Sequence, residues 1–109
     1  MLAQQALERF TDLRQPRGIA HASRVRGLVA LARRQDVTAS DMFNCALSLA
    51  REHGLELLQA ETLLALAVIA QRRGSAPDRF RLVEQAQNIF KAINAEAWGE
   101  QVARRMQQF

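Results

Sequence analysis

Apolar residues recur three and four positions apart along almost the whole chain, with polar residues between them. This spacing gathers the apolar side chains on one face of a helix, and it is typical of amphipathic α-helices. Helix-interrupting residues separate these segments, at Pro16, Asp36–Ser40, Gly54, Gly74–Pro77 and Asn94. We therefore predict six helices, over residues 2–13, 17–34, 39–53, 56–73, 76–93 and 95–107. Their connections of about 2–5 residues favour antiparallel neighbours, so we expect one all-α domain over residues 1–109.

Each predicted helix carries an apolar stripe that we expect to face the core. The stripes are Ala3, Ala6, Leu7, Phe10 and Leu13; Ile19, Ala22, Val25, Leu28, Val29 and Ala32; Phe43, Ala46, Leu47, Leu49 and Ala50; Leu63, Leu66, Ala67 and Ala70; Phe80, Val83, Ala86, Ile89, Phe90 and Ile93; and Ala97, Trp98, Val102 and Met106. The ends of the helices carry signals as well. Residues 38–41 are similar to a capping box, with Val37 and Met42 as a hydrophobic staple. Gly54 is expected to end one helix, and Ser75 to cap the start of another.

The stripes contain an internal repeat. Ala6, Ala46 and Ala86 stand 40 residues apart, each at the same place in its helix. The second and fourth predicted helices align best at an offset of 38, where Ala22 meets Ala60 and Ala32 meets Ala70. A fixed period of 38–40 residues, with two helices in each period, is typical of an α-solenoid.

The repeat resembles a known family at several short motifs. Ala86-x-x-x-Phe90 resembles the second-helix signature of the tetratricopeptide repeat, and Leu66-Ala67-x-x-Ala70 resembles its first helix. Leu28-Val29-x-x-Ala32 matches that first helix more weakly. The stretch from Ala60 to Arg105, which includes Asn94-Ala95-Glu96-Ala97-Trp98, looks most like the repeats of bacterial LuxR-type and MalT-like regulators. The resemblance implies a short right-handed α-solenoid that serves as a scaffold or sensor for protein partners.

Composition supports the helical interpretation and narrows the function. Apolar residues make up 49% of the chain, while there are only five Gly, two Pro and one Cys. This excludes a disulfide scaffold and an all-β sandwich. The net charge is +4, but it alternates along the chain, from +4 over residues 1–36 to −3 over residues 37–71 and +3 over residues 72–109. A basic helical protein that binds nucleic acid is therefore an alternative, opposed by the acidic middle segment.

Residues for catalysis or metal binding are scarce. The two histidines, His21 and His53, fall on different predicted helices, and Cys45 has no second cysteine with which to bind zinc. The glycines are scattered, so there is no phosphate-binding loop. We therefore expect no enzyme activity, no metal and no cofactor. The longest apolar run, Leu63–Ala70, is too short to span a membrane. A lone cysteine without an export signal suggests a cytoplasmic protein.

The resemblance also suggests where a partner binds. In the tetratricopeptide family the first helix of each pair lines a concave face. Leu64 and Val68 are apolar positions left over from the core stripe, and they lie near arginines in the sequence. Such a surface suits a peptide or partner helix that carries carboxylates. The candidate binding residues are Arg26, Arg33, Arg34, Glu61, Leu64, Val68, Gln71 and Arg72.

The first predicted helix suggests a second kind of surface. It aligns with the second half of a repeat whose first half is missing, so one apolar side would lack a cover. Leu2, Leu7 and Phe10 are the candidate residues. Self-association as a homodimer, or continuation into a longer chain, is therefore a further alternative.

Overall fold

The computed structural model describes residues 15–109, which form five α-helices and, within that range, no strand. The helices are α2 (Pro16–Ala32), α3 (Asp36–Glu52), α4 (Glu56–Arg72), α5 (Ala76–Ala92) and α6 (Glu96–Met106). The all-α prediction is confirmed for this part of the chain. The predicted helix over residues 2–13, with Leu2, Leu7 and Phe10, lies outside the described residues. Within the described range, no helix has the length and apolar character needed to cross a membrane.

The helices recur at a regular interval. Each begins 20 residues after the one before, at Pro16, Asp36, Glu56, Ala76 and Glu96. Four turns separate them, and each turn contains one residue with a positive φ angle. These residues are Arg34 (61°), Gly54 (65°), Gly74 (75°) and Asn94 (57°), again 20 positions apart.

The four turns share one hydrogen-bond pattern. In each, the residue after the positive-φ position donates its N–H to a carbonyl five residues back, over 2.8 to 3.0 Å. The donor and acceptor pairs are Gln35 and Ala30, Leu55 and Ala50, Ser75 and Ala70, and Ala95 and Phe90. This is the main bond of a Schellman motif, which satisfies the last carbonyls of a helix. The chain therefore reverses the same way at every turn.

The turns provide a direct test of the backbone geometry. Replacing Arg34 with Gly should raise the free energy of unfolding by about 1 kcal/mol, because a side chain at positive φ clashes with the following carbonyl. Gly74→Ala should lower it by a similar amount, since no atom near Gly74 would otherwise obstruct a Cβ. Urea unfolding of both variants measures the two changes. Shifts of the same sign would contradict the proposed equivalence of the turns.

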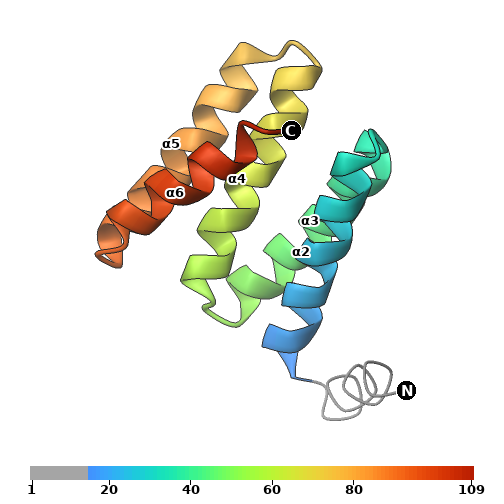
Figure 1. Ribbon diagram of the computed structural model, residues 1–109. Coiled ribbons are helices and arrows are strands. Elements are labelled where there is room, and N and C mark those ends of the chain that lie inside the picture. Colours follow the sequence, from blue (N-terminus) through green and yellow to red (C-terminus); the bar gives the residue numbers. More distant parts are fainter. Residues whose placement is uncertain (1–14) are drawn as a thin grey trace.

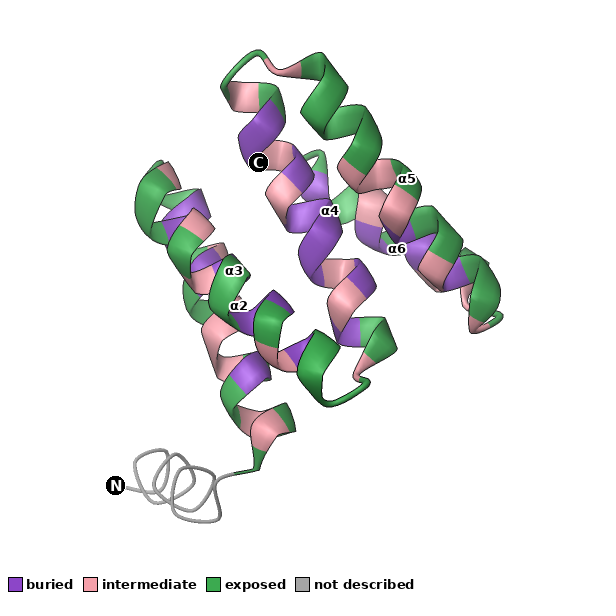
Figure 2. Cartoon of the chain, turned by 180° about the vertical axis from the view of Figure 1, so that it is seen from behind, coloured by how far each residue is buried: buried purple, intermediate pink, exposed green. Residues whose placement is uncertain are grey.

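The centre of the molecule is α4. Helices α2 and α3 pack as one antiparallel pair and α4 and α5 as the next, while α3 and α4 join the two pairs (Figure 1). Helix α6 packs on both α4 and α5. Nine residues of α4 are buried, on several of its faces, and it shows the most burial in Figure 2. This is why α4 has no single apolar stripe.

Two phenylalanines pack against glycines of neighbouring helices. A Cβ on Gly27 of α2 would lie 2.6 Å from the Phe43 ring of α3. A Cβ on Gly99 of α6 would lie 2.7 Å from the Phe90 ring of α5. Each glycine therefore lets a buried aromatic ring approach the backbone of the next helix. Phe43 and Phe90 belong to one continuous core that extends from α2 to α6.

Several predicted helix boundaries are wrong by a few residues. Helix α3 begins at Asp36, so residues 38–41 lie inside it and form no capping box. Val37 is exposed and is no staple. Helix α2 ends at Ala32 rather than at residue 34, because Arg34 has a positive φ. Ser75 does occupy the N-cap of α5, but its side chain makes no capping hydrogen bond.

The predicted core stripes hold on some helices and fail on others. Those of α3 are confirmed at Phe43, Ala46, Leu47 and Ala50, and those of α5 at Ala86 and Phe90. On α2 the prediction is wrong, because Ile19, Val25 and Val29 are 38%, 43% and 46% exposed. Ala20, Gly27, Ala30 and Leu31 are buried instead, since these mostly small residues allow α3 to approach closely. Phe80, at the exposed start of α5, is also not in the core.

The offset between α2 and α4 is also corrected. The sequence alignment favoured 38 residues, but the starts of the two helices are 40 apart. At this offset the fully buried Ala20 corresponds to the fully buried Ala60, and Gly27 corresponds to Ala67. Matching large apolar side chains gave the wrong register, because small residues occupy the helix contacts.

Candidate functional site

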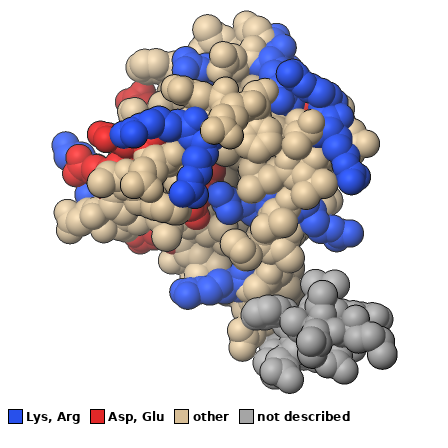
Figure 3. Space-filling view, in the orientation of Figure 1, with Lys and Arg blue, Asp and Glu red and all other residues tan. Residues whose placement is uncertain are grey.

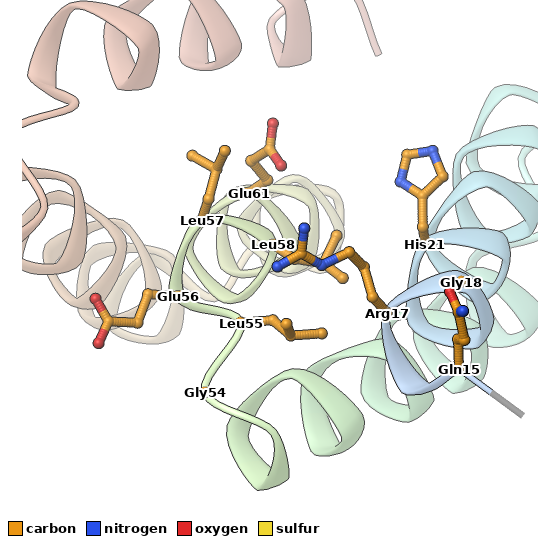
Figure 4. Close-up of a pocket in the computed structure, with 10 residues that line it drawn as sticks. All are labelled: Gln15, Arg17, Gly18, His21, Gly54, Leu55, Glu56, Leu57, Leu58 and Glu61. Carbon is orange, nitrogen blue, oxygen red and sulfur yellow. The ribbon is translucent and has the colours of Figure 1, made fainter.

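A cleft of about 560 Å³ lies between the start of α2 and the start of α4 (Figure 4). Two regular features create it. The turn at Gly54 and Leu55 brings α4 back alongside α3, and α2 forms the opposite wall. The lining is mainly apolar, from Leu55, Leu57 and Leu58. Leu57 is exposed, so its side chain is accessible to a partner.

Charged side chains surround this cleft. Arg17 extends from α2 into the space between the helices, toward Leu55 and Leu58, as Figure 4 shows. His21 stands one turn further along the same helix. Glu61 of α4 lies across the cleft, so that one wall is basic and the other acidic. Glu56 also lines the α4 side, but its carboxylate points outward in Figure 4.

Glu61 is held in place by the C-terminal helix. Trp98 Nε1 of α6 donates a hydrogen bond to Glu61 Oε2 over 3.0 Å. The guanidinium of Arg105 lies 5.2 Å from the centre of the Trp98 ring, within range of a cation–π contact. Arg105, Trp98 and Glu61 thus connect α6 to α4. Glu61 was a predicted binding residue, and the structure gives it this second, structural contact.

A separate groove of about 390 Å³ lies between α2 and α3, which we call the α2–α3 groove. Two of the predicted binding arginines, Arg26 and Arg33, lie on it. Val25, Val29 and Met42 supply its apolar lining. The combination of arginines with exposed apolar side chains, predicted from the sequence, therefore occurs here, but with Val25 and Val29 in place of Leu64 and Val68.

Leu64, Val68 and Gln71 lie elsewhere. Leu64 was predicted to be an exposed apolar position, and this is wrong, because it is buried in the core. Val68 is partly buried against the same core. The three residues border α6 near Ala103, so the end of the chain covers much of this part of α4. The sequence could not show this, since α6 packs on α4 over a long separation.

Arg72 is committed to contacts within the protein. Its Nη1 lies 2.6 Å from Asp36 Oδ1 and 3.1 Å from the backbone oxygen of Leu31, while its Nη2 lies 2.6 Å from the backbone oxygen of Phe109. Its side chain is 14% exposed. Arg72 therefore joins α2, α3, α4 and the C-terminal residue. Arg34, by contrast, is exposed in the turn after α2.

The eight predicted binding residues consequently do not form one surface. Arg26 and Arg33 share the α2–α3 groove, Glu61 lines the cleft, and Arg72 is a structural cross-link. Sequence reasoning missed Arg17 as a cleft residue. A usable signal was present, because Arg17 and His21 are four residues apart and so share one face of α2.

The chemistry of these surfaces favours binding over catalysis. Across residues 15–109, no three or more His, Cys, Asp or Glu side chains come together in a way that could hold a metal ion. Cys45 is exposed and contacts only Ser23 Oγ, at 3.8 Å. On the face in Figure 3, the basic side chains are spread over several elements, with acidic ones among them on the α5–α6 side. That arrangement does not form a continuous basic surface.

A scan against protein-family models found no match, and searches of curated proteins and of solved structures found no similar protein. The residues of the chain therefore carry the functional conclusion by themselves.

Proposed function

We propose that the protein is a non-catalytic protein-interaction module that binds a peptide or partner helix bearing carboxylates in the cleft between α2 and α4. The observation that carries this proposal is the cleft itself, which combines the exposed Leu57 with Arg17 and His21 on the facing helix. An apolar side chain of the partner packs beside Leu57 and Leu55. A carboxylate of the partner accepts hydrogen bonds from the Arg17 guanidinium.

The architecture of the chain supports the same class of function. Helix starts every 20 residues, with two helices in each 40, fit a short right-handed α-solenoid of the tetratricopeptide type. Such repeats present extended surfaces to their partners. The cleft between α2 and α4 lies between the first helices of successive pairs, which form the concave face in that family. A scaffold or sensor part of a bacterial regulator in the reducing cytoplasm is the setting we infer.

Nucleic-acid binding is the competing function. It rests on an excess of arginine, with 15 basic against 11 acidic residues. Glu56 and Glu61 line the cleft, however, and would repel a phosphate backbone there. Binding to duplex DNA that falls steeply with salt, and that exceeds binding to acidic peptides, would favour this alternative.

The cleft proposal predicts a charge-dependent selection of peptides. Panning a random peptide display library on the immobilised protein should enrich sequences that combine Asp or Glu with large apolar residues. A selected peptide, labelled with fluorescein, should bind Arg17→Glu at least about tenfold more weakly than wild type, because a charge-assisted hydrogen bond of about 1.5–3 kcal/mol is replaced by repulsion. Fluorescence anisotropy measures both affinities.

Arg51→Glu is the matched control. Arg51 is an exposed arginine of α3 that does not line the cleft, so its reversal changes the net charge equally and should leave the affinity nearly unchanged. Equal weakening by Arg17→Glu and Arg51→Glu would indicate long-range charge attraction only. Equal binding by wild type and Arg17→Glu would exclude the cleft as the binding site.

A further inference from the structure

The α2–α3 groove has a counterpart 40 residues later, between α4 and α5, which we call the α4–α5 groove. Seven of the eight residues that line the first groove correspond, at this offset, to residues that line the second. Three of the pairs are Val29 and Ile69, Arg33 and Arg73, and Met42 and Leu82. The two helix pairs therefore present the same surface, built from equivalent positions.

Only the second of these surfaces is covered by a described helix. Ser40 and Asn44 of α3 also line the α4–α5 groove, and since they are four residues apart they share one face of α3. That groove is about 200 Å³, against about 390 Å³ for the α2–α3 groove. Ile69 on its wall is 2% exposed, whereas the equivalent Val29 is 46% exposed. The helix before each pair is therefore what buries this wall.

The chain contains a segment at the corresponding position. Forty residues before α3 ends, the sequence is at Asp12, and the apolar periodicity predicts a helix over residues 2–13. We propose that this segment forms a helix that lies on the α2–α3 groove, as α3 lies on the α4–α5 groove. Gln4 then takes the place of Asn44, and Leu7 takes the place of the buried Leu47.

The connection and the charges both fit this placement. Arg14-Gln15 before α2 repeats Arg34-Gln35 before α3, and Gln15 and Gln35 are the N-cap residues of those helices. The same type of turn therefore links the segment to α2. Glu8 is four residues after Gln4 and shares its helix face, so it would meet the arginines on the groove, Arg26 and Arg33.

A cross-linking experiment on the full chain tests the placement. In a Cys45→Ser background, Gln4→Cys and Val29→Cys should be joined efficiently by a short bis-maleimide within one chain. Gln5→Cys with Val29→Cys is the matched control, because Gln5 corresponds to the exposed Cys45 on the other side of the helix. It should react several-fold more slowly. Mass spectrometry of the joined peptides identifies the link.

The possible outcomes separate the proposal from its alternatives. Equal rates for the Gln4 and Gln5 variants, or no link between residues 4 and 29, would overturn it. A link that joins two chains would overturn it in favour of a second copy of this protein as the occupant. These results are independent of the cleft and of the peptide that binds there.

A thermodynamic cycle gives a second test that requires no cross-linker. Leu7→Ala and Val29→Ala together should lower the urea midpoint by clearly less than the sum of their separate effects, since each removes the same contact. Leu7→Ala combined with Leu57→Ala, on a different surface, should be additive. Additive effects in both cycles would contradict the proposed contact.

Discussion

Replacing Phe43 with alanine is expected to lower the free energy of unfolding by about 3–5 kcal/mol, the largest effect of any single substitution we predict. Phe43 is 0% exposed and is the largest of the fully buried side chains. Its ring fills the space above Gly27, where the adjacent helix has no side chain that could move in to replace it. The variant therefore loses both apolar burial and packing contacts, and a cavity remains.

The measurement is urea unfolding followed by circular dichroism, with Phe80→Ala as the matched control. Phe80 is 69% exposed near the start of α5, so its truncation should change the free energy of unfolding by less than about 0.5 kcal/mol. The two variants remove the same atoms, and they differ only in burial. Similar midpoints for both would mean that Phe43 is not in the core.

The regularity of the fold could be read from the sequence only in part. The 40-residue spacing of Ala6, Ala46 and Ala86 gave the correct period for α3 and α5. The turns were harder to predict, because two of the four positive-φ positions are Arg34 and Asn94 rather than glycine. A glycine-based search for helix ends therefore extends α2 too far, to residue 34.

The error on α2 has a different physical cause. Periodicity shows that Val25 and Val29 form an apolar face, but it does not show which element covers that face. Among the described residues, α3 packs on the side of α2 with Ala20 and Gly27, and the valines stay exposed. The periodic pattern and the structure are reconciled if the segment before α2 provides the missing cover, which is the contact that we propose.

The candidate site illustrates a limit of local sequence patterns. Arg17 and Glu61 are 44 residues apart, and only the packing of α2 beside α4 brings them to one cleft. Spacing within a helix can identify neighbours such as Arg17 and His21, but not residues across a cleft. The predicted set was right to include Glu61 and wrong about the exposure of Leu64.

Arg72 shows the same limit more strongly, and its removal is the second large effect. Arg72→Met should lower the free energy of unfolding by about 2–3 kcal/mol, because it breaks a mostly buried ion pair with Asp36 and leaves two backbone oxygens without this donor. Methionine keeps most of the apolar stem, so the loss reflects the guanidinium. The free energy is obtained from urea unfolding, as for Phe43.

Arg73→Met is the control for this prediction. Arg73 is the exposed neighbour at the C-cap of α4, and its substitution removes an identical charge. It should cost less than about 0.5 kcal/mol, because exposed charges contribute little to stability. In a double-mutant cycle, Asp36→Asn should add much less to Arg72→Met than it costs alone, since the pair is already broken. If Arg72→Met and Arg73→Met unfold at the same urea concentration, Arg72 is a free surface arginine, and a role in partner binding becomes open to it again.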